Sequence, residues 1–245
     1  MIAKPVVFVV QDYVMAAMLD DVAQRLAARG IEVIRGAQNA PGKAYEFPRE
    51  QWDAWLGRAD AVVMSVRHTC PRPVLEWAPR LRAVVAPAIG VDTIDVAAAT
   101  ELGIIVAHGA TPENFLSMSE AGVMLMLNLL YNPNASRDVL YGRRERPRVD
   151  PASAWAQMAM GKTLGLIGCG RIARGIIERL QGWSMRIITT DPFVKADSLP
   201  PNVELVDFDT LIKSSDVVCA TVALTPETTN LVDDRALRLM KREAF

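Results

Sequence analysis

The stretch from residue 162 to residue 192 constrains the fold of this chain more than any other part of the sequence. It opens with Thr163–Ile167, a short apolar run that is typical of a buried strand. The run breaks at residues 168–170 (Gly-Cys-Gly), and apolar residues then recur at helical spacing. A second apolar run at 185–188 leads to the acidic Asp191. Strand, glycine turn, helix, strand and acid in this order predict a dinucleotide-binding βαβ unit.

Several residues of this unit have a physical role in binding a dinucleotide. Gly168 permits a tight turn, and Gly170 lets the backbone approach a pyrophosphate because it has no Cβ. The free N–H groups near Arg171 and Ile172 begin a helix whose positive dipole end attracts phosphate. Asp191 follows Gly170 by 21 residues, where a carboxylate can accept both ribose hydroxyls. Since its charge repels a 2′-phosphate, we expect the cofactor to be NAD rather than NADP.

Composition narrows the class of protein. The 245 residues are enough for two modest domains. A formal net charge of -1 gives no field that would attract nucleic acid or an anionic membrane, and no apolar run approaches the ~20 residues of a membrane-spanning helix. The three cysteines, Cys70, Cys169 and Cys219, lack the spacing of metal ligands. We therefore expect no metal site and a reducing, cytoplasmic location.

Apolar runs alternate with helical patterns through the first 107 residues, which predicts a parallel sheet with helices on both faces. The expected strands are 5–10, 31–34, 61–66, 82–86 and 104–107, and the expected helices are 15–28, 50–56, 73–77 and 94–102. Beyond the dinucleotide-binding unit, strands are expected at 203–206 and 216–221, and helices at 208–213 and 233–241.

A different kind of helix is expected between these two regions, at residues 118–131. Ser117 and Glu120 have the S-x-x-E spacing of a capping box, which would start the helix there. The helix is apolar on nearly every side, and residues 132–134 (Asn-Pro-Asn) would end it. Such a helix must be buried, either between domains or against another subunit.

Four blocks of the sequence, together with their order, carry a resemblance to a known family. The blocks are IGVDTIDVAAATELGI, NFLSMSE, GKTLGLIGCGRIA and LTPETTNLVDDRALRLMK, at residues 89–104, 114–120, 161–173 and 224–241. They resemble the D-isomer-specific 2-hydroxyacid dehydrogenases, relatives of phosphoglycerate dehydrogenase, glyoxylate reductase and formate dehydrogenase. The resemblance implies an α/β protein of two Rossmann-like or flavodoxin-like parallel-sheet domains joined by a hinge helix, with an active cleft between them.

The resemblance also implies the roles of the two domains. Residues 1–107 would form the substrate (catalytic) domain, and residues 108–245 the hinge helix with the NAD-binding Rossmann domain. Only about two thirds of a six-stranded dinucleotide-binding sheet is expected in the second domain. The chain is therefore expected to be truncated. The 118–131 helix resembles the arm through which members of the family dimerise, so a homodimer is expected.

Residue roles follow from the resemblance position by position. Arg171 and Ile172 would contact the pyrophosphate, and Asp191 the adenosine ribose. The remaining cofactor contacts would come from a segment after a later strand: Thr221, Val222, Ala223 and Thr228. Arg67 resembles the arginine of the family's substrate loop, and its neighbour His68 is a candidate beside it. The alternative for Arg67 is an exposed loop arginine, and the alternative for His68 is a structural or solvated loop histidine.

The expected reaction is hydride transfer between NAD and a small 2-hydroxy or 2-oxo acid. The family's catalytic arginine, glutamate and histidine fall after the position that matches Phe245, so none is expected in this chain. His68 and His108, its only histidines, match no catalytic position. We therefore expect no turnover from these 245 residues alone. Two alternatives are a catalytically inert NAD-binding or dimerising module, and a fragment that folds poorly.

Overall fold

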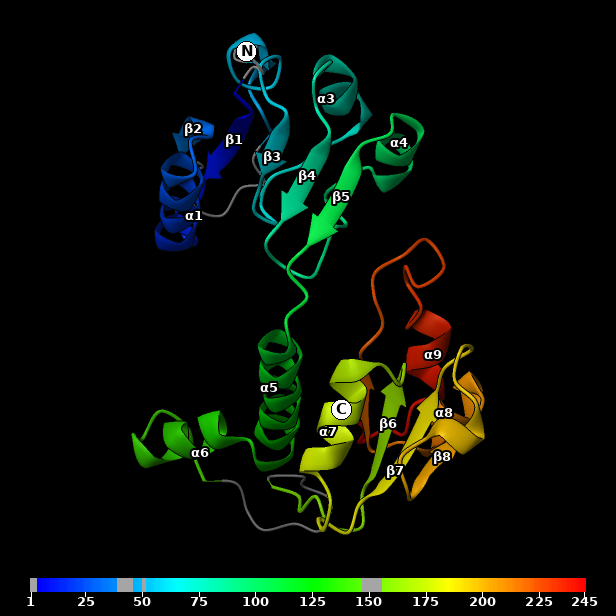
Figure 1. The fold of residues 1–245 in the computed structure, drawn as a ribbon. Coiled ribbons are helices and arrows are strands. Elements are labelled where there is room, and N and C mark those ends of the chain that lie inside the picture. The colour runs from blue at the N-terminus through cyan, green and yellow to red at the C-terminus, as the bar shows by residue number, and fades with distance from the viewer. Residues whose placement is uncertain (1–3, 39–45, 50–51, 147–155) are drawn as a thin grey trace. The chain divides into compact units, whose positions relative to one another are not determined.

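The computed structural model describes residues 4–38, 46–49, 52–146 and 156–245, and it consists of two compact units, Met1–Ala110 and Thr111–Phe245 (Figure 1). The last strand of the first sheet extends to His108, one residue past the range 1–107 that was expected for the first domain. Each unit has its own sheet, and every strand pair in both is parallel. Within the described ranges, no helix is long and apolar enough to cross a membrane.

The first unit is a five-stranded sheet in the order β2-β1-β3-β4-β5. Its elements are β1 (Val6–Gln11), α1 (Ala16–Ala28), β2 (Glu32–Gln38), α2 (Trp52–Trp55), β3 (Ala61–Val63), α3 (Arg72–Trp77), β4 (Ala83–Ala86), α4 (Val96–Glu101) and β5 (Ile105–His108). This strand order is the flavodoxin-like one. The predicted α/β class with parallel sheets is confirmed.

The core of the first unit lies around β1. All but the last residue of this strand are buried, because a central parallel strand is covered on both faces. Leu19 of α1 and Leu75 of α3 are fully buried and belong to the same apolar cluster as β1. Because β1 is packed against these helices, the residues that follow its carboxyl end, and that of the neighbouring β3, start from fixed positions.

The second unit has a four-stranded sheet in the order β8-β7-β6-β9. Its elements are α5 (Pro112–Tyr131), α6 (Pro133–Leu140), β6 (Thr163–Ile167), α7 (Arg171–Arg179), β7 (Arg186–Thr190), the 3-10 helix η2 (Ala196–Ser198), β8 (Val203–Leu205), α8 (Phe208–Ser214), β9 (Val217–Ala220) and α9 (Asp234–Leu239). Four strands in this order match the first four of the 3-2-1-4-5-6 Rossmann arrangement.

Helix α5 packs closely against α7 (Figure 1), and two glycines permit this approach. A Cβ atom on Gly175 of α7 would lie 2.3 Å from Ser119 Oγ, and one on Gly122 of α5 would lie 2.8 Å from Ile176 Cδ1. The Ser119 hydroxyl lies 3.0 Å from the Ile172 carbonyl oxygen, to which it can donate. α5 is thus fixed to the helix that begins at the glycine turn.

The start of α5 differs from the expected one. The helix begins at Pro112, with Thr111 at the N-cap position, since proline is pre-organised for a first helical residue and needs no N–H partner there. The expected capping box at Ser117 and Glu120 is therefore wrong, because both residues lie inside the helix. Glu120 instead forms an ion pair with Arg179 of α7, at 3.0 Å.

The end of α5 was predicted correctly, but a second helix follows it at once. Asn132 adopts a left-handed conformation (φ 45°, ψ 55°) that ends α5. Its side chain also accepts a hydrogen bond from the Ala135 N–H at 3.3 Å and so caps α6. The Asn-Pro-Asn sequence was interpreted only as a stop, although asparagine followed by proline is also a helix start.

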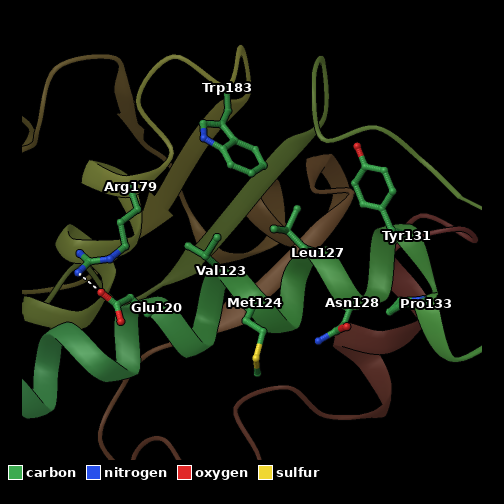
Figure 2. Close-up of a pocket in the computed structure, with 9 residues that line it drawn as sticks. All are labelled: Glu120, Val123, Met124, Leu127, Asn128, Tyr131, Pro133, Arg179 and Trp183. Carbon is green, nitrogen blue, oxygen red and sulfur yellow. Dashed lines mark hydrogen bonds and ion pairs between the residues drawn. The ribbon is translucent and has the colours of Figure 1, made fainter.

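Within one chain, α5 leaves large apolar side chains exposed, so the expected burial of this helix stays a prediction that depends on another surface. The exposed side chains make up the open face of α5 and are Leu116, Met118, Met124, Leu125, Leu129 and Tyr131. Beside this face α5, α7 and the following turn form an apolar groove (Figure 2), lined by Glu120, Val123, Met124, Leu127, Asn128, Tyr131, Pro133, Arg179 and Trp183.

Candidate functional site

Three neighbouring strands of the second sheet end at one edge, and the predicted cofactor residues follow them. Gly168 comes directly after β6, Asp191 after β7 and Thr221 after β9. In the order β8-β7-β6-β9 the chain leaves β6 on one side for β7 and arrives on the other at β9. Ligands of open α/β sheets bind outside the carboxyl ends of the strands at such a switch point.

The turn after β6 depends on glycine at position 168. Gly168 has φ +90°, a left-handed conformation that other residues rarely adopt, and an added Cβ would lie 2.8 Å from Val222 Cγ1. Thr221 fixes the same turn from β9, since its hydroxyl lies 3.1 Å from the Ile167 carbonyl oxygen and 3.0 Å from that of Gly168. The predicted tight turn is thus present.

Gly170 has a different environment, because no atom of the residues that the structure describes lies within 4 Å of the position that its Cβ would take. It is the N-cap residue of α7, and because glycine has no side chain it cannot cap the N–H groups of this helix start itself. The N–H groups of Arg171 and Ile172 begin the helix there, with the positive end of its dipole. This combination of open space and exposed donors suits an anionic group.

The Asp191 carboxylate is held in place by two backbone amides. Its Oδ2 accepts from the Cys169 N–H and its Oδ1 from the Phe193 N–H, both at 2.8 Å. The first bond joins the acid at the end of β7 to the glycine turn after β6. Each carboxylate oxygen has a further lone pair, so both can still accept hydrogen bonds from a ligand.

The segment after β9 is held mainly by its own threonines. The Thr228 hydroxyl donates to the Ala223 carbonyl oxygen at 2.6 Å and accepts from the Thr225 N–H at 2.8 Å. Thr228, predicted as a polar contact to the cofactor, therefore has a role within its own loop. Val222 and Ala223 are exposed beside the glycine turn, where an apolar surface can face a ligand.

The predicted substrate residues lie at the corresponding edge of the first sheet. Arg67 and His68 follow β3, which is the neighbour of β1 at the switch point of the flavodoxin-like order. The Arg67 Nη1 atom lies 3.3 Å from each carboxylate oxygen of Asp12. The guanidinium also lies over the Tyr13 ring, 5.6 Å from its centroid. Its side chain is 31% exposed, so part of it still faces solvent.

Asp12 and Ser65 are candidate site residues that the sequence analysis missed. The Asp12 carboxylate is fully buried, and it accepts hydrogen bonds from the Ser65 hydroxyl at 2.6 Å and from the Val14 and Met15 N–H groups. The sequence did contain one signal for this site, because Asp12 is an acidic residue that directly follows an apolar strand. Its pairing with residues about fifty positions later requires that β1 and β3 be neighbours.

His68 is fully buried in this cluster, with its Nδ1 atom 3.0 Å from Ser65 Oγ. The pKa of His68 is lowered to about 4, mainly by burial; the charge of Asp12 opposes this shift and the charge of Arg67 adds to it. His68 is therefore neutral at neutral pH. Its side chain is enclosed, and its role in substrate binding stays a prediction.

Comparison with protein families gives matches over nearly the whole chain. Residues 13–120 match the catalytic domain of the D-isomer specific 2-hydroxyacid dehydrogenases, and residues 123–245 match the NAD binding domain of the same family. The cofactor of the second unit is therefore NAD.

Individual proteins give the same result. D-3-phosphoglycerate dehydrogenase of Methanocaldococcus jannaschii is 36% identical over 192 residues, which are 76% of this chain and 35% of that protein. Glyoxylate reductase of Pyrococcus horikoshii is 32% identical over 207 residues, 83% of this chain and 62% of that protein. The chain thus spans between about a third and three fifths of these relatives.

A solved structure is similar over both units. The NAD-dependent formate dehydrogenase of Staphylococcus aureus, determined in complex with NAD, gives a TM-score of 0.78 at 27% identity, covering 99% of this chain and 72% of that one. Together with the two family matches and the switch-point geometry, this similarity shows that the chain belongs to the D-isomer specific 2-hydroxyacid dehydrogenase family.

Proposed function

We propose that the chain is part of an NAD-dependent D-2-hydroxyacid dehydrogenase, which transfers a hydride between the nicotinamide and C2 of a small 2-hydroxy or 2-oxo acid. The cofactor would be held by the glycine turn, by Arg171 and Ile172, and by Asp191 and the segment after β9. Arg67 would attract the carboxylate of the acid, since its guanidinium is partly exposed at the end of β3. The bound NAD supplies the hydride chemistry.

The observation that carries this proposal is the open space at Gly170. Gly170 is exposed, and no described atom of the chain lies within 4 Å of the position that its Cβ would take. The exposed N–H groups of α7 begin there, and the carboxylate of Asp191 is tied to the same turn by the Cys169 N–H. A pyrophosphate with an adjacent ribose fits this set of donors and acceptors.

A pair of glycine variants tests the proposal. Gly170→Ala should cost no more stability than alanine costs in place of glycine at an N-cap, since no described atom meets its Cβ and φ is -78°. It should nevertheless weaken NADH binding strongly, because the new methyl group occupies the approach of the pyrophosphate. Gly142→Ala is the reciprocal control, because it lies in the turn after α6 with φ +66°. It should lower stability by about 1 kcal/mol and leave binding unchanged.

The preference between coenzymes gives a second measurement. Asp191 should disfavour the 2′-phosphate of NADPH through like-charge repulsion. Titration of the chain with NADH and NADPH, followed by calorimetry, should show clearly tighter binding of NADH. Equal affinities would contradict the assigned position of Asp191, whereas an absence of binding by both would contradict the cofactor site itself.

A catalytically inert NAD-binding or dimerising module is the second candidate for these 245 residues. The observation that favours it is the burial of His68, which lowers its pKa to about 4, so that at neutral pH it is not an imidazolium that could act as a general acid. We expect NADH binding but no NADH oxidation with hydroxypyruvate or glyoxylate. Turnover by this chain would show that its own residues supply the acid and base.

The open face of α5 supports a homodimer. Met118, Met124, Leu125 and Leu129 are between 47% and 57% exposed, and a second copy of the chain would remove these side chains from water. We propose a second copy of this chain as the partner because the 118–131 helix resembles the arm through which members of the family dimerise. A cytoplasmic location stays a prediction from the cysteine content.

A further inference from the structure

Arg171 is the first residue of α7, and the structure leaves its polar groups available. Its side chain is exposed. Within the described part of the chain, no acceptor or carboxylate lies within bonding distance of its guanidinium. Its recorded contact is instead with an aromatic ring, since its Cζ atom lies 4.7 Å from the centroid of Phe115. The guanidinium is therefore placed by a ring face and not by an ion pair.

Phe115 is itself held firmly relative to α7. It lies in the first turns of α5 and is half-buried. The Ser119 hydroxyl lies 2.7 Å from the Phe115 carbonyl oxygen and 3.0 Å from that of Ile172, the residue after Arg171. The missing side chain of Gly175 makes room for this hydroxyl. The ring and the start of α7 are therefore parts of one packed interface.

Stacking on a ring uses the face of a guanidinium and leaves its N–H donors, which lie in the guanidinium plane, free for hydrogen bonds. A long arginine side chain at an exposed helix start would otherwise sample many rotamers, and its ordering would oppose ligand binding. We propose that Phe115 is a positioning residue that orients the Arg171 guanidinium toward the NAD pyrophosphate before the cofactor binds. This inference rests on the proposed function, because Arg171 is one of its cofactor residues.

The test compares the affinities of NADH and adenosine for the 245-residue chain. Phe115→Leu keeps an apolar side chain but removes the ring, so NADH should bind about two- to five-fold more weakly, the range expected for an exposed cation–π contact. Adenosine has no phosphate, and its affinity should not change. Phe115→Tyr should restore NADH binding, because its ring also attracts a cation. Leu116→Ala, on the same exposed turn, is the matched control and should bind NADH as the unmodified chain does.

Arg171→Lys provides a second route that does not disturb the packed interface. It keeps the charge but loses the planar group, so it should weaken NADH binding to a similar extent, and Phe115→Leu should add little to it. Equal NADH affinities of Phe115→Leu and the unmodified chain, or parallel losses for NADH and adenosine, would overturn the positioning role alone. If the unmodified chain bound no NADH, the proposed function would fall and this inference with it.

Discussion

Asp12 illustrates how a buried charge can be stable when its partners are fixed. The carboxylate is inaccessible to water, yet it accepts from a hydroxyl, two backbone N–H groups and a guanidinium. Removal of one charged partner from such a group is costly, because the other remains buried without compensation. Arg67 is therefore tied at one end to a fixed carboxylate. These contacts explain how an arginine in a loop can keep a defined position.

His68 leads to a prediction about pH. Its pKa is about 4 in the folded chain and about 6.5 in the unfolded chain. Between these values the unfolded chain binds a proton that the folded chain does not, so stability falls as pH drops. Chemical denaturation at pH 7 and pH 5 should show a loss of about 2 kcal/mol that is missing in His68→Asn. The other titrating groups are common to both chains, so an equal loss in the variant would contradict the lowered pKa.

At the scale of elements, much of the fold was predictable because strand and helix patterns are local. The run Thr163–Ile167 was predicted with the bounds that the structure shows, and Gly168 has the left-handed φ that its place after a strand indicated. The start of α5 was not predictable from one motif, since the S-x-x-E spacing of Ser117 and Glu120 competes with Pro112 five residues earlier. The helix starts at Pro112, the residue type that is pre-organised for a first helical position, and this second signal was not weighed.

Gly165 shows the same limit within a correctly predicted strand. The strand pattern gave no reason for a glycine in the middle of β6. In the structure its Cβ would lie 2.1 Å from Ser215 Oγ and 2.8 Å from Leu211 Cδ2. The serine hydroxyl is buried and bonded to the Leu211 carbonyl oxygen at 2.7 Å, so it cannot easily move away. α8 can approach the strand only because the side chain is absent.

Gly165→Ala should therefore destabilise the second unit by about 1–3 kcal/mol through overpacking. Thermal unfolding measures the loss, and Ser215→Ala in the same chain should recover part of it by removing the nearer atom. Gly170→Ala, where nothing is close, is the control for adding a methyl group at a glycine. A melting temperature that is equally unaffected in both glycine variants would mean that α8 is not packed against β6 as described.

For the whole molecule, the candidate sites were only partly predictable. The glycine turn and Asp191 lie within one continuous βαβ unit, so spacing along the chain was enough to relate them. The Asp12 cluster joins residues more than fifty positions apart, and it becomes visible only once β1 and β3 are paired. The oligomeric state is harder to predict from the sequence than either site. The apolarity of the 118–131 helix predicted that it would be buried, but it did not identify the surface that covers it.

Leu125 tests whether a second copy of the chain covers that face. Its side chain is 57% exposed on α5, so Leu125→Arg should not disturb the fold of one chain, but it would place a charge in an apolar contact with a heavy desolvation cost. We expect light scattering to give twice the 26.8 kDa of the chain for the unmodified protein and the single mass for the variant. Leu237→Arg on α9, where the leucine is 56% exposed, is the matched control and should leave the dimer intact. If Leu125→Arg remained dimeric, the subunits would have to meet elsewhere, and the open face of α5 would need another partner.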